Sequence, residues 1–455
     1  HALVAKNLID HPITPMLYKT PLLDYDYRLW TDNYIWIHKQ PLFLWQIALS
    51  MKIFGINELS VRIPDIIMHA IIPVMIYRVA KISTGDARLS FFSAIFFAVA
   101  FYPLELVAGA LPTDHNDTAF LFYVFAGFWA WFEYSKSKKT YWLVLIGIFS
   151  GCAVLVKWLM GLLVFLCWGL TFLFNKENLF RLKAYIPIVI SFAIAILVFL
   201  PWQLYVLSVF PTESSFEFST YSHHFSTPVE GHGEPLWFHF QNTGIIYGNL
   251  LIILSIISGI FILFFKCNLK IYRIFIFGSI LFVYVFYSLA QTKMQSFPTI
   301  VSPFIYMSIA ATFVFITDFF RKKISAKTLY WLTYGILLCL FAYSLMQIEN
   351  TDKQHDLFAT TINESRNIKM KERAFIEKVN KQNYGNKVVI FNTNFAQGGN
   401  IPFMFYTDHV AYRSIPDPNQ IAYLKNTGYK IIILDFGNLP ENIVSDKEIL
   451  KLSPN

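Results

Sequence analysis

The chain has 455 residues, of which 55% are hydrophobic and only 15% are charged, and its mean hydropathy is +0.47. These values place it among polytopic membrane proteins rather than soluble ones. The net charge of +8 arises in good part from short loops between apolar segments, so membrane topology explains it and no nucleic-acid partner is implied. The four cysteines lie in or beside apolar segments without metal or redox spacing, and they predict no disulfide framework.

The N-terminal part, residues 1–58, is predicted to be a first extracytoplasmic loop with interfacial helices. The chain opens with His1 rather than Met, and the polar residues that follow read as a loop, so we expect at least one further membrane span upstream. The stretch from Pro41 to Gly55 is apolar but too short to span a bilayer comfortably. It is predicted to lie in the interface as an amphipathic helix, with Trp45 and Lys52 at the lipid headgroups.

Residues 59–347 are predicted to form a helical transmembrane domain, which makes the protein mainly α and polytopic. The ten expected spans lie near residues 59–80, 88–109, 117–134, 140–156, 158–174, 184–208, 244–265, 272–291, 298–317 and 328–347. Every second loop between them is basic, and by the positive-inside rule these loops face the cytoplasm. The first loop and residues 350–455 are then expected on the periplasmic side of a bacterial inner membrane.

Two lysines, Lys157 and Lys293, are the only cations in the outer loops between the expected spans. Lys157 lies near the middle of the apolar run 140–174, which is too long for one span and is predicted to turn at this lysine. A charge held against hydrocarbon is costly and indicates a functional site. Two cations at an outer membrane surface suit a lipid-borne phosphate. The alternative is that each lysine only satisfies carbonyl groups at a helix C-terminus.

Residues 350–455 have the composition of a soluble domain, and they predict a small extracytoplasmic α/β unit. Three short buried strands are expected at 387–392, 409–413 and 429–435. Between the last two, a helix is expected to begin after Asp417 as its cap and to end at Gly428.

The outer loops also concentrate side chains that bind metals or move protons, so chemistry is predicted on the outer side. The candidates between the spans are Asp114, Asp117, His223, His224, Glu230 and His232. Two acids around a histidine at a turn can handle protons or bind a metal. Asp114 could equally cap the helix that begins near Asp117. A single loop histidine is usually polar surface, but several histidines and glutamates in one loop favour a functional role.

Dispersed motifs also carry a family resemblance. The segments are Ile37-His38-Lys39-Gln40-Pro41-Leu42, Arg62-Ile63-Pro64, Asp117 with Phe120 and Phe122, Leu155-Val156-Lys157-Trp158, His223-His224-Phe225, and Ser288 through Lys293 to Pro298. They resemble the C-type membrane glycosyltransferases that use polyprenyl-phosphate sugars, in particular the lipid A aminoarabinose transferase and protein O-mannosyltransferase group. The resemblance covers residues 1 to about 310. Each motif is weak alone, but their order on one membrane face makes the set specific.

The resemblance implies roles for individual residues. It implies that the donor phosphate is bound by Lys39, Lys157 and Lys293. His38 replaces a metal-binding glutamate of the family, and with His224, or less well His223, it would hold a divalent metal such as zinc, magnesium or manganese. Asp117, with Asp114 as its competitor, matches an acidic catalytic motif.

The chain also departs from the family pattern. The family's Asp-Glu pair, which holds the general base, has no match and is expected upstream of His1. No arginine precedes the acidic motif. Phe297 stands where relatives have a tyrosine, so a phosphate-binding hydroxyl is missing there.

Together these observations predict an inverting glycosyltransferase. It would move a monosaccharide from a polyprenyl-phosphate donor to a lipid, glycan or protein acceptor among membrane lipids, without a nucleotide cofactor. One alternative is a transporter or flippase of lipid-linked sugars, which would place ionisable groups near the membrane centre within broken helices. Another is a catalytically inactive lipid-binding protein. The position of the acids and bases at the outer ends of the spans favours the enzyme.

Overall fold

The computed structural model describes residues 1–108, 116–174, 179–229, 231–248, 250–321, 359–382, 384–395, 399–437 and 439–454, with isolated residues between 325 and 343. The chain divides into two compact units. One, here called the α/β unit, consists of His1–His38, Leu44–Val61 and Thr351–Asn455. The other, the helical unit, consists of Lys39–Phe43 and Arg62–Asn350.

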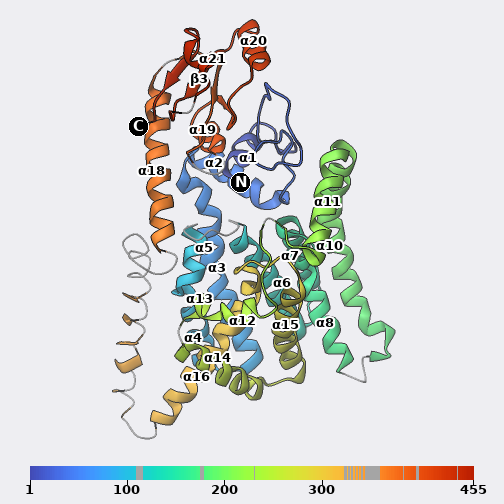
Figure 1. Ribbon diagram of the computed structural model, residues 1–455. Helices are drawn as coiled ribbons and strands as arrows, with labels where there is room; N and C mark the ends of the chain where they lie inside the picture. Colours follow the sequence, from blue (N-terminus) through green and yellow to red (C-terminus); the bar gives the residue numbers. More distant parts are fainter. Residues whose placement is uncertain are drawn as a thin grey trace. The chain divides into compact units, whose positions relative to one another are not determined.

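The helical unit is built from apolar helices, because a helix satisfies its backbone hydrogen bonds within its own segment where water is excluded. Its helices are α3 (Glu58–Thr84), α4 (Ala87–Ala98), α5 (Phe101–Ala108), α6 (Asp117–Ser137), α7 (Thr140–Lys157), α8 (Leu163–Leu173), α10 (Leu182–Val209), α11 (Pro211–Ser226), α12 (Phe238–Gln241), α13 (Thr243–Tyr247), α14 (Leu250–Lys266), α15 (Lys270–Leu289) and α16 (Ser302–Arg321) (Figure 1). Two short 3-10 helices, η1 (Leu159–Leu162) and η2 (Phe297–Val301), precede α8 and α16.

Five of the described helices are long and apolar enough to cross a membrane, or up to seven if each bent helix pair counts as one span. The five are α3, α7, α10, α15 and η2 with α16, and all coincide with expected spans. The bent pairs are α4 with α5, at 43°, and α12–α13 with α14, at 107°. Helices α6 and α8 also lie at expected positions, whereas half of the expected span 328–347 falls outside the described residues. The total of ten spans therefore stays a prediction.

Glycine permits the closest contacts between these helices. A Cβ atom on Gly147 of α7 would lie 2.5 Å from the carbonyl oxygen of Ser191 on α10. A Cβ atom on Gly259 of α14 would overlap the carbonyl oxygen of Ser308 on α16. Small residues allow membrane helices to approach in this way. The contact with α10 helps to fix α7, which ends at Lys157.

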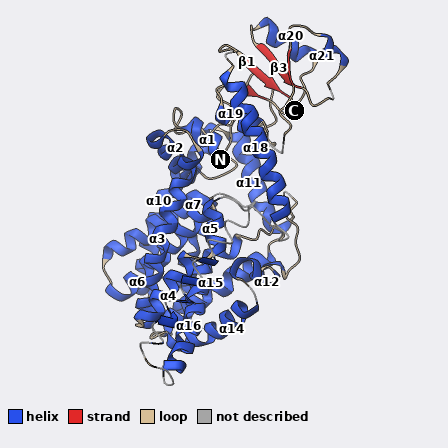
Figure 2. Ribbon diagram, turned by 90° about the vertical axis from the view of Figure 1, so that its left-hand side faces the viewer, coloured by secondary structure: helices blue, strands red, loops and turns tan. Residues whose placement is uncertain are grey.

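The α/β unit contains helices and a sheet, as the C-terminal composition predicted, and the strands of the sheet are parallel. Its strands are β1 (Val388–Phe391), β2 (Val410–Ala411), β3 (Lys430–Leu434) and β4 (Leu450–Leu452), in the order β2-β1-β3-β4 (Figure 2). Its helices are α18 (Ala359–Lys381), α19 (Asn400–Tyr406), α20 (Pro418–Asn426) and α21 (Glu441–Ser445). The three expected strands and the helix capped by Asp417 are confirmed, and Gln420 completes a capping box. Strand β4 and helix α18 were not predicted.

The N-terminal segment belongs to the same unit as this sheet. It contains α1 (Ala2–Leu8) and leads to α2 (Pro41–Phe54), which confirms a helix at the predicted interfacial stretch. The Lys6 Nζ atom donates to the carbonyl oxygens of Met404, Phe405 and Thr407, each at 3.0 Å. The Asn400 amide donates to the Tyr18 hydroxyl at 3.0 Å. The first loop and the C-terminal residues thus share one folded unit.

Candidate functional site

The apolar run 140–174 breaks immediately after Lys157, as predicted. Helix α7 ends there, and η1 leads into α8. Gly161 of η1 packs against the last turns of α7, since a Cβ atom on it would lie 2.5 Å from the backbone nitrogen of Val154. The chain therefore folds back tightly, and Lys157 is held at the turn.

The partner of Lys157 is Asp117, the first residue of α6. The Lys157 Nζ atom donates to Asp117 Oδ1, and the exposed fractions of the two side chains are 19% and 4%. The two turns are also joined by Asn116, whose side-chain amide donates to the carbonyl oxygen of Val156 at 3.2 Å. An acid in the first turn of a helix also interacts favourably with the helix dipole. The structure thus brings together two residues that the sequence selected separately.

A small pocket lies at this ion pair, and it is too narrow to admit a water molecule. It is lined by Asp117, Phe120, Lys157, Tyr287, Ser296, Phe297, Thr299 and Ile300. The Lys157 Nζ atom lies 4.9 Å from the centroid of the Phe297 ring, a cation–π contact. Tyr287 packs against Phe297 with ring centroids 4.8 Å apart, and it interacts electrostatically with both charges of the pair. The tyrosine expected at position 297 is absent, but Tyr287 brings a phenol to the same pocket.

Lys293 behaves differently from Lys157. It is 3% exposed, and its Nζ atom donates to the carbonyl oxygen of Ala290, the residue that caps α15, at 2.6 Å. This is the helix-end contact that was the alternative to phosphate binding. Its backbone N–H donates to the carbonyl oxygen of His232 at 3.0 Å. The segment around Lys293 is therefore bound to the histidine-rich loop that contains His232.

The predicted metal ligands His38 and His224 belong to different units, so their pairing on a metal ion stays a prediction. His223 is exposed, and His224 is half-buried with its ring 6.2 Å from that of Tyr221. His38 belongs to the α/β unit, where its ring stacks on Trp30. Among the residues that the structure describes, no three His, Cys, Asp or Glu side chains lie together as a metal ion would require.

The remaining candidates are placed as follows. Asp114 and Glu230 fall outside the described residues. Lys39 is half-buried in the helical unit, next to Gln40, whose side chain accepts a hydrogen bond from Gln203 of α10 at 2.8 Å. No described contact joins Lys39 to Lys157.

Two charged residues near the pocket were missed as site residues. Asp65 of α3 has no exposed surface, and within the described part of the chain neither of its carboxylate oxygens has a hydrogen-bond partner. It interacts electrostatically with Asp117 and with Arg62, which lies one helical turn earlier. A buried carboxylate is costly, and an acid inside an apolar span indicates function by default. That signal was visible in the sequence, because Asp65 lies inside the expected span 59–80.

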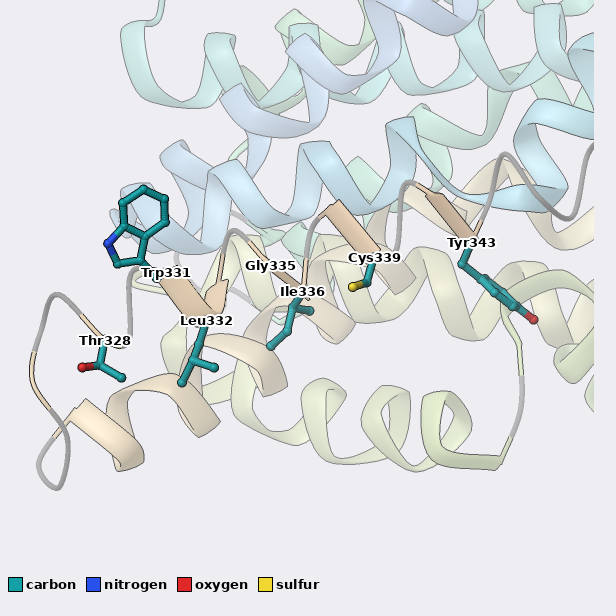
Figure 3. Close-up of a pocket in the computed structure, with 7 residues that line it drawn as sticks. All are labelled: Thr328, Trp331, Leu332, Gly335, Ile336, Cys339 and Tyr343. Carbon is teal, nitrogen blue, oxygen red and sulfur yellow. The ribbon is translucent and has the colours of Figure 1, made fainter.

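A larger open groove, of about 830 Å³, follows residues 328–343. It is lined by Thr328, Trp331, Leu332, Gly335, Ile336, Cys339 and Tyr343 (Figure 3). None of these residues carries a charge at neutral pH. The groove therefore offers no cation to a phosphate, and its lining is mostly apolar.

Comparisons with known sequences match parts of the chain. Residues 38–205 match the model of the dolichyl-phosphate-mannose-protein mannosyltransferase family. An undecaprenyl phosphate-alpha-4-amino-4-deoxy-L-arabinose arabinosyl transferase of Pseudomonas fluorescens is 27% identical over 205 residues, or 43% of this chain and 35% of that protein. A protein of Aquifex aeolicus is 30% identical over 123 residues, or 27% of this chain and 23% of that protein. The matches thus span about a third or less of these relatives' length.

Solved structures share the fold over most of the chain. ArnT from Cupriavidus metallidurans bound to undecaprenyl phosphate superposes with a TM-score of 0.65 at 12% identity, covering 94% of this chain and 82% of that one. The apo oligosaccharyltransferase of Archaeoglobus fulgidus gives a TM-score of 0.55 at 12% identity, covering 91% of this chain and 60% of that one. At such identities the superpositions establish a common fold and leave the substrates open.

Proposed function

We propose that this chain, a relative of the C-type membrane glycosyltransferases, moves a monosaccharide from a polyprenyl-phosphate donor to an acceptor hydroxyl. The resemblance to that family is confirmed by the family match at residues 38–205 and by the shared fold. The reaction would take place at the outer face of a bacterial inner membrane. A lipid, a glycan or a protein could supply the hydroxyl.

The buried ion pair of Asp117 and Lys157 carries this proposal. Transfer of the sugar leaves one more negative charge on the lipid phosphate, and a preorganised cation in a site that excludes water stabilises this developing charge. Lys157 is such a cation, because Asp117 and the ring of Phe297 hold it at a fixed turn. The groups around the pair leave no space that a water molecule could enter. The phosphate would therefore enter by sharing Lys157 with Asp117.

Neighbouring groups support an anion in this pocket. Arg62 brings a second cation near the pair through its interaction with Asp65, which partly replaces the arginine missing before the acidic motif. The phenol of Tyr287 can donate a hydrogen bond to phosphate, as can the hydroxyls of Ser296 and Thr299. Lys39 and Lys293 remain proposed phosphate ligands. Lys293 would have to exchange its carbonyl contact for the phosphate.

The acceptor proton needs a base other than a tightly paired carboxylate. Asp117 is already bound to Lys157, and an adjacent cation makes a carboxylate a weaker base. We therefore assign Asp117 to positioning Lys157. The general base would be another carboxylate. Attack by the acceptor on the side opposite to the phosphate would invert the anomeric carbon.

Sugar transfer can be measured on the full-length protein in liposomes. Undecaprenyl-phosphate sugars would be supplied as donors, and release of undecaprenyl phosphate would be followed. Lys157→Ala is expected to lower kcat by about 10²–10³-fold, the cost of removing one charge-stabilising group. The matched variant Lys266→Ala, at a partly exposed pair elsewhere in the helical unit, should stay within about twofold, as weak surface pairs do. No release by the parent protein from any donor tested would overturn the proposal.

A flippase for lipid-linked sugars is the second candidate, and the bent helices favour it. The pairs α4–α5 and α12–α13 with α14 are interrupted, as in transporters that bind ligands within the membrane. Glu105 of α5 is 1% exposed and could serve such a path. Movement of a labelled donor lipid between leaflets, with no release of its phosphate, would identify the flippase.

A further inference from the structure

Trp158 adopts a backbone conformation that is otherwise essentially restricted to glycine. Its φ is +72° and its ψ is −159°. Lys138, another residue with positive φ, lies in the left-handed helical region at 57° and 18°, where single residues are tolerated. A bulky residue in the extended region at positive φ is strained, and it persists only where its surroundings hold it.

The side chain of Trp158 is held by α11. Its indole stacks on Phe218 with centroids 5.2 Å apart and planes at 28°, and on Tyr221 at 5.7 Å and 17°. Phe218 and Tyr221 are three residues apart, so they lie on one face of the helix. Helix α11 is a polar helix that follows α10 (Figure 1). Its contact with Trp158 ties it to the turn that carries Lys157.

The C-terminal end of α11 is tied to the segment that carries Lys293. The carbonyl oxygen of His224 accepts a hydrogen bond from the backbone N–H of Thr292 at 3.0 Å. The carbonyl oxygen of Phe225 accepts one from Gln291 at 3.2 Å. Helix α11 therefore contacts both of the turns whose lysines stand out in the sequence.

We propose that Trp158 is a positioning residue and that α11 is a brace that sets the relative position of Lys157 and Lys293. This inference rests on the proposed function, because it gives the two lysines a common ligand, the donor phosphate. The strained backbone has a direct consequence: if the indole loses its partners on α11, the turn relaxes and Lys157, the adjacent residue, moves with it. The brace would thus tune the affinity for the donor.

The test uses the full-length protein in liposomes and two independent readouts. Trp158→Gly removes the ring and the strain together. The double variant Phe218→Ala/Tyr221→Ala removes the partners and leaves Trp158 in place. Lys138→Gly is the matched control, because it also relaxes a residue with positive φ but is remote from α11. Amide hydrogen exchange of residues 211–226 reports on the brace, and KM and kcat for the donor report on its effect.

Trp158→Gly and the double variant are each expected to raise the donor KM about tenfold, because two aromatic contacts are lost. The kcat of each variant should change less than about threefold. Exchange across α11 should become at least about tenfold faster, as expected for a helix that opens locally. Lys138→Gly should change neither readout. Unchanged exchange and KM in both Trp158→Gly and the double variant would overturn the brace. Faster exchange in a protein that releases no polyprenyl phosphate would uphold the mechanical tie and refute the transfer function instead.

Discussion

Replacing Lys157 with alanine should destabilise the helical unit as well as impair transfer. Lys157 is the partner of Asp117, whose side chain is only 4% exposed. Removing one member of a buried pair leaves an uncompensated charge, at a cost of about 3–5 kcal/mol. Because Lys157 is itself 19% exposed, water can reach part of the site. We therefore expect a loss at the lower end, about 3 kcal/mol of unfolding free energy.

The double variant Lys157→Met/Asp117→Asn separates stability from function. It removes both charges, and a buried pair replaced as a whole is often nearly neutral for stability. Most of the lost stability should return, so the double-mutant cycle should give a coupling free energy of at least about 2 kcal/mol. Transfer should stay lost, because the cation is still missing. Unfolding in detergent micelles and sugar transfer would be measured on the same preparations.

The pair of Lys266 and Asp86 is the matched comparison. Their charged atoms are 3.1 Å apart, but the side chains are 30% and 20% exposed. Lys266→Ala should therefore cost less than about 1 kcal/mol. If Lys157→Ala were no more destabilising than Lys266→Ala, the buried pair would not contribute as the structure indicates. Failure of the double variant to recover stability would refute the reasoning in the same way.

Burial raises the pKa of Glu372 in α18 to about 7, well above the ordinary value of a glutamate, so the folded α/β unit keeps a proton that the unfolded chain releases. The unfolding free energy of the α/β unit should be highest below pH 4.5 and should fall by about 3 kcal/mol as the pH rises to 7. Denaturant titrations at a series of pH values would measure this fall, and Glu372→Gln should abolish it. Lys6→Met should lower the unfolding free energy of the same unit by roughly 3 kcal/mol, because three buried carbonyl oxygens lose their hydrogen-bond donor. Lys19 is exposed, so Lys19→Met should lower it by less than about 1 kcal/mol. Amide hydrogen exchange of the strands measures both losses. A cysteine at the exposed Asn442 should react with a membrane-impermeant thiol reagent from the periplasmic side, and protection until the inner membrane is opened would reverse the proposed topology.

Local features of the fold were predictable because local sequence causes them. Apolar runs predicted the helices α3, α7, α10 and α15, since a segment in hydrocarbon must satisfy its own backbone. The break at Lys157 followed from the excessive length of the run 140–174. The cap at Asp417 followed from a side chain that can accept backbone N–H groups. Helix α18 was missed because it is amphipathic and mostly polar, with no apolar run to mark it.

The candidate site was predictable in its residue types and only partly in its contacts. Two isolated lysines looked equivalent in the sequence, yet Lys157 pairs with an acid and Lys293 caps its own helix end. Asp65 was visible as an acid in an apolar span, but its proximity to Asp117 depends on how α3 packs. The phenol of Tyr287 could not be assigned to the pocket, because tyrosines are frequent throughout the chain.

The sequence by itself determined that the chain is a helical membrane protein with a small α/β unit, and that few cations lie in every second loop between its apolar segments. Those properties follow from composition, hydrophobic length and loop charge, which act over a few residues at a time. Only the tertiary structure decided that Asp117 meets Lys157 across 40 positions, and that the rings of α11 hold Trp158 in a strained turn. Such contacts depend on the packing of whole helices, whose free energy is a sum over many small contacts that no local pattern encodes.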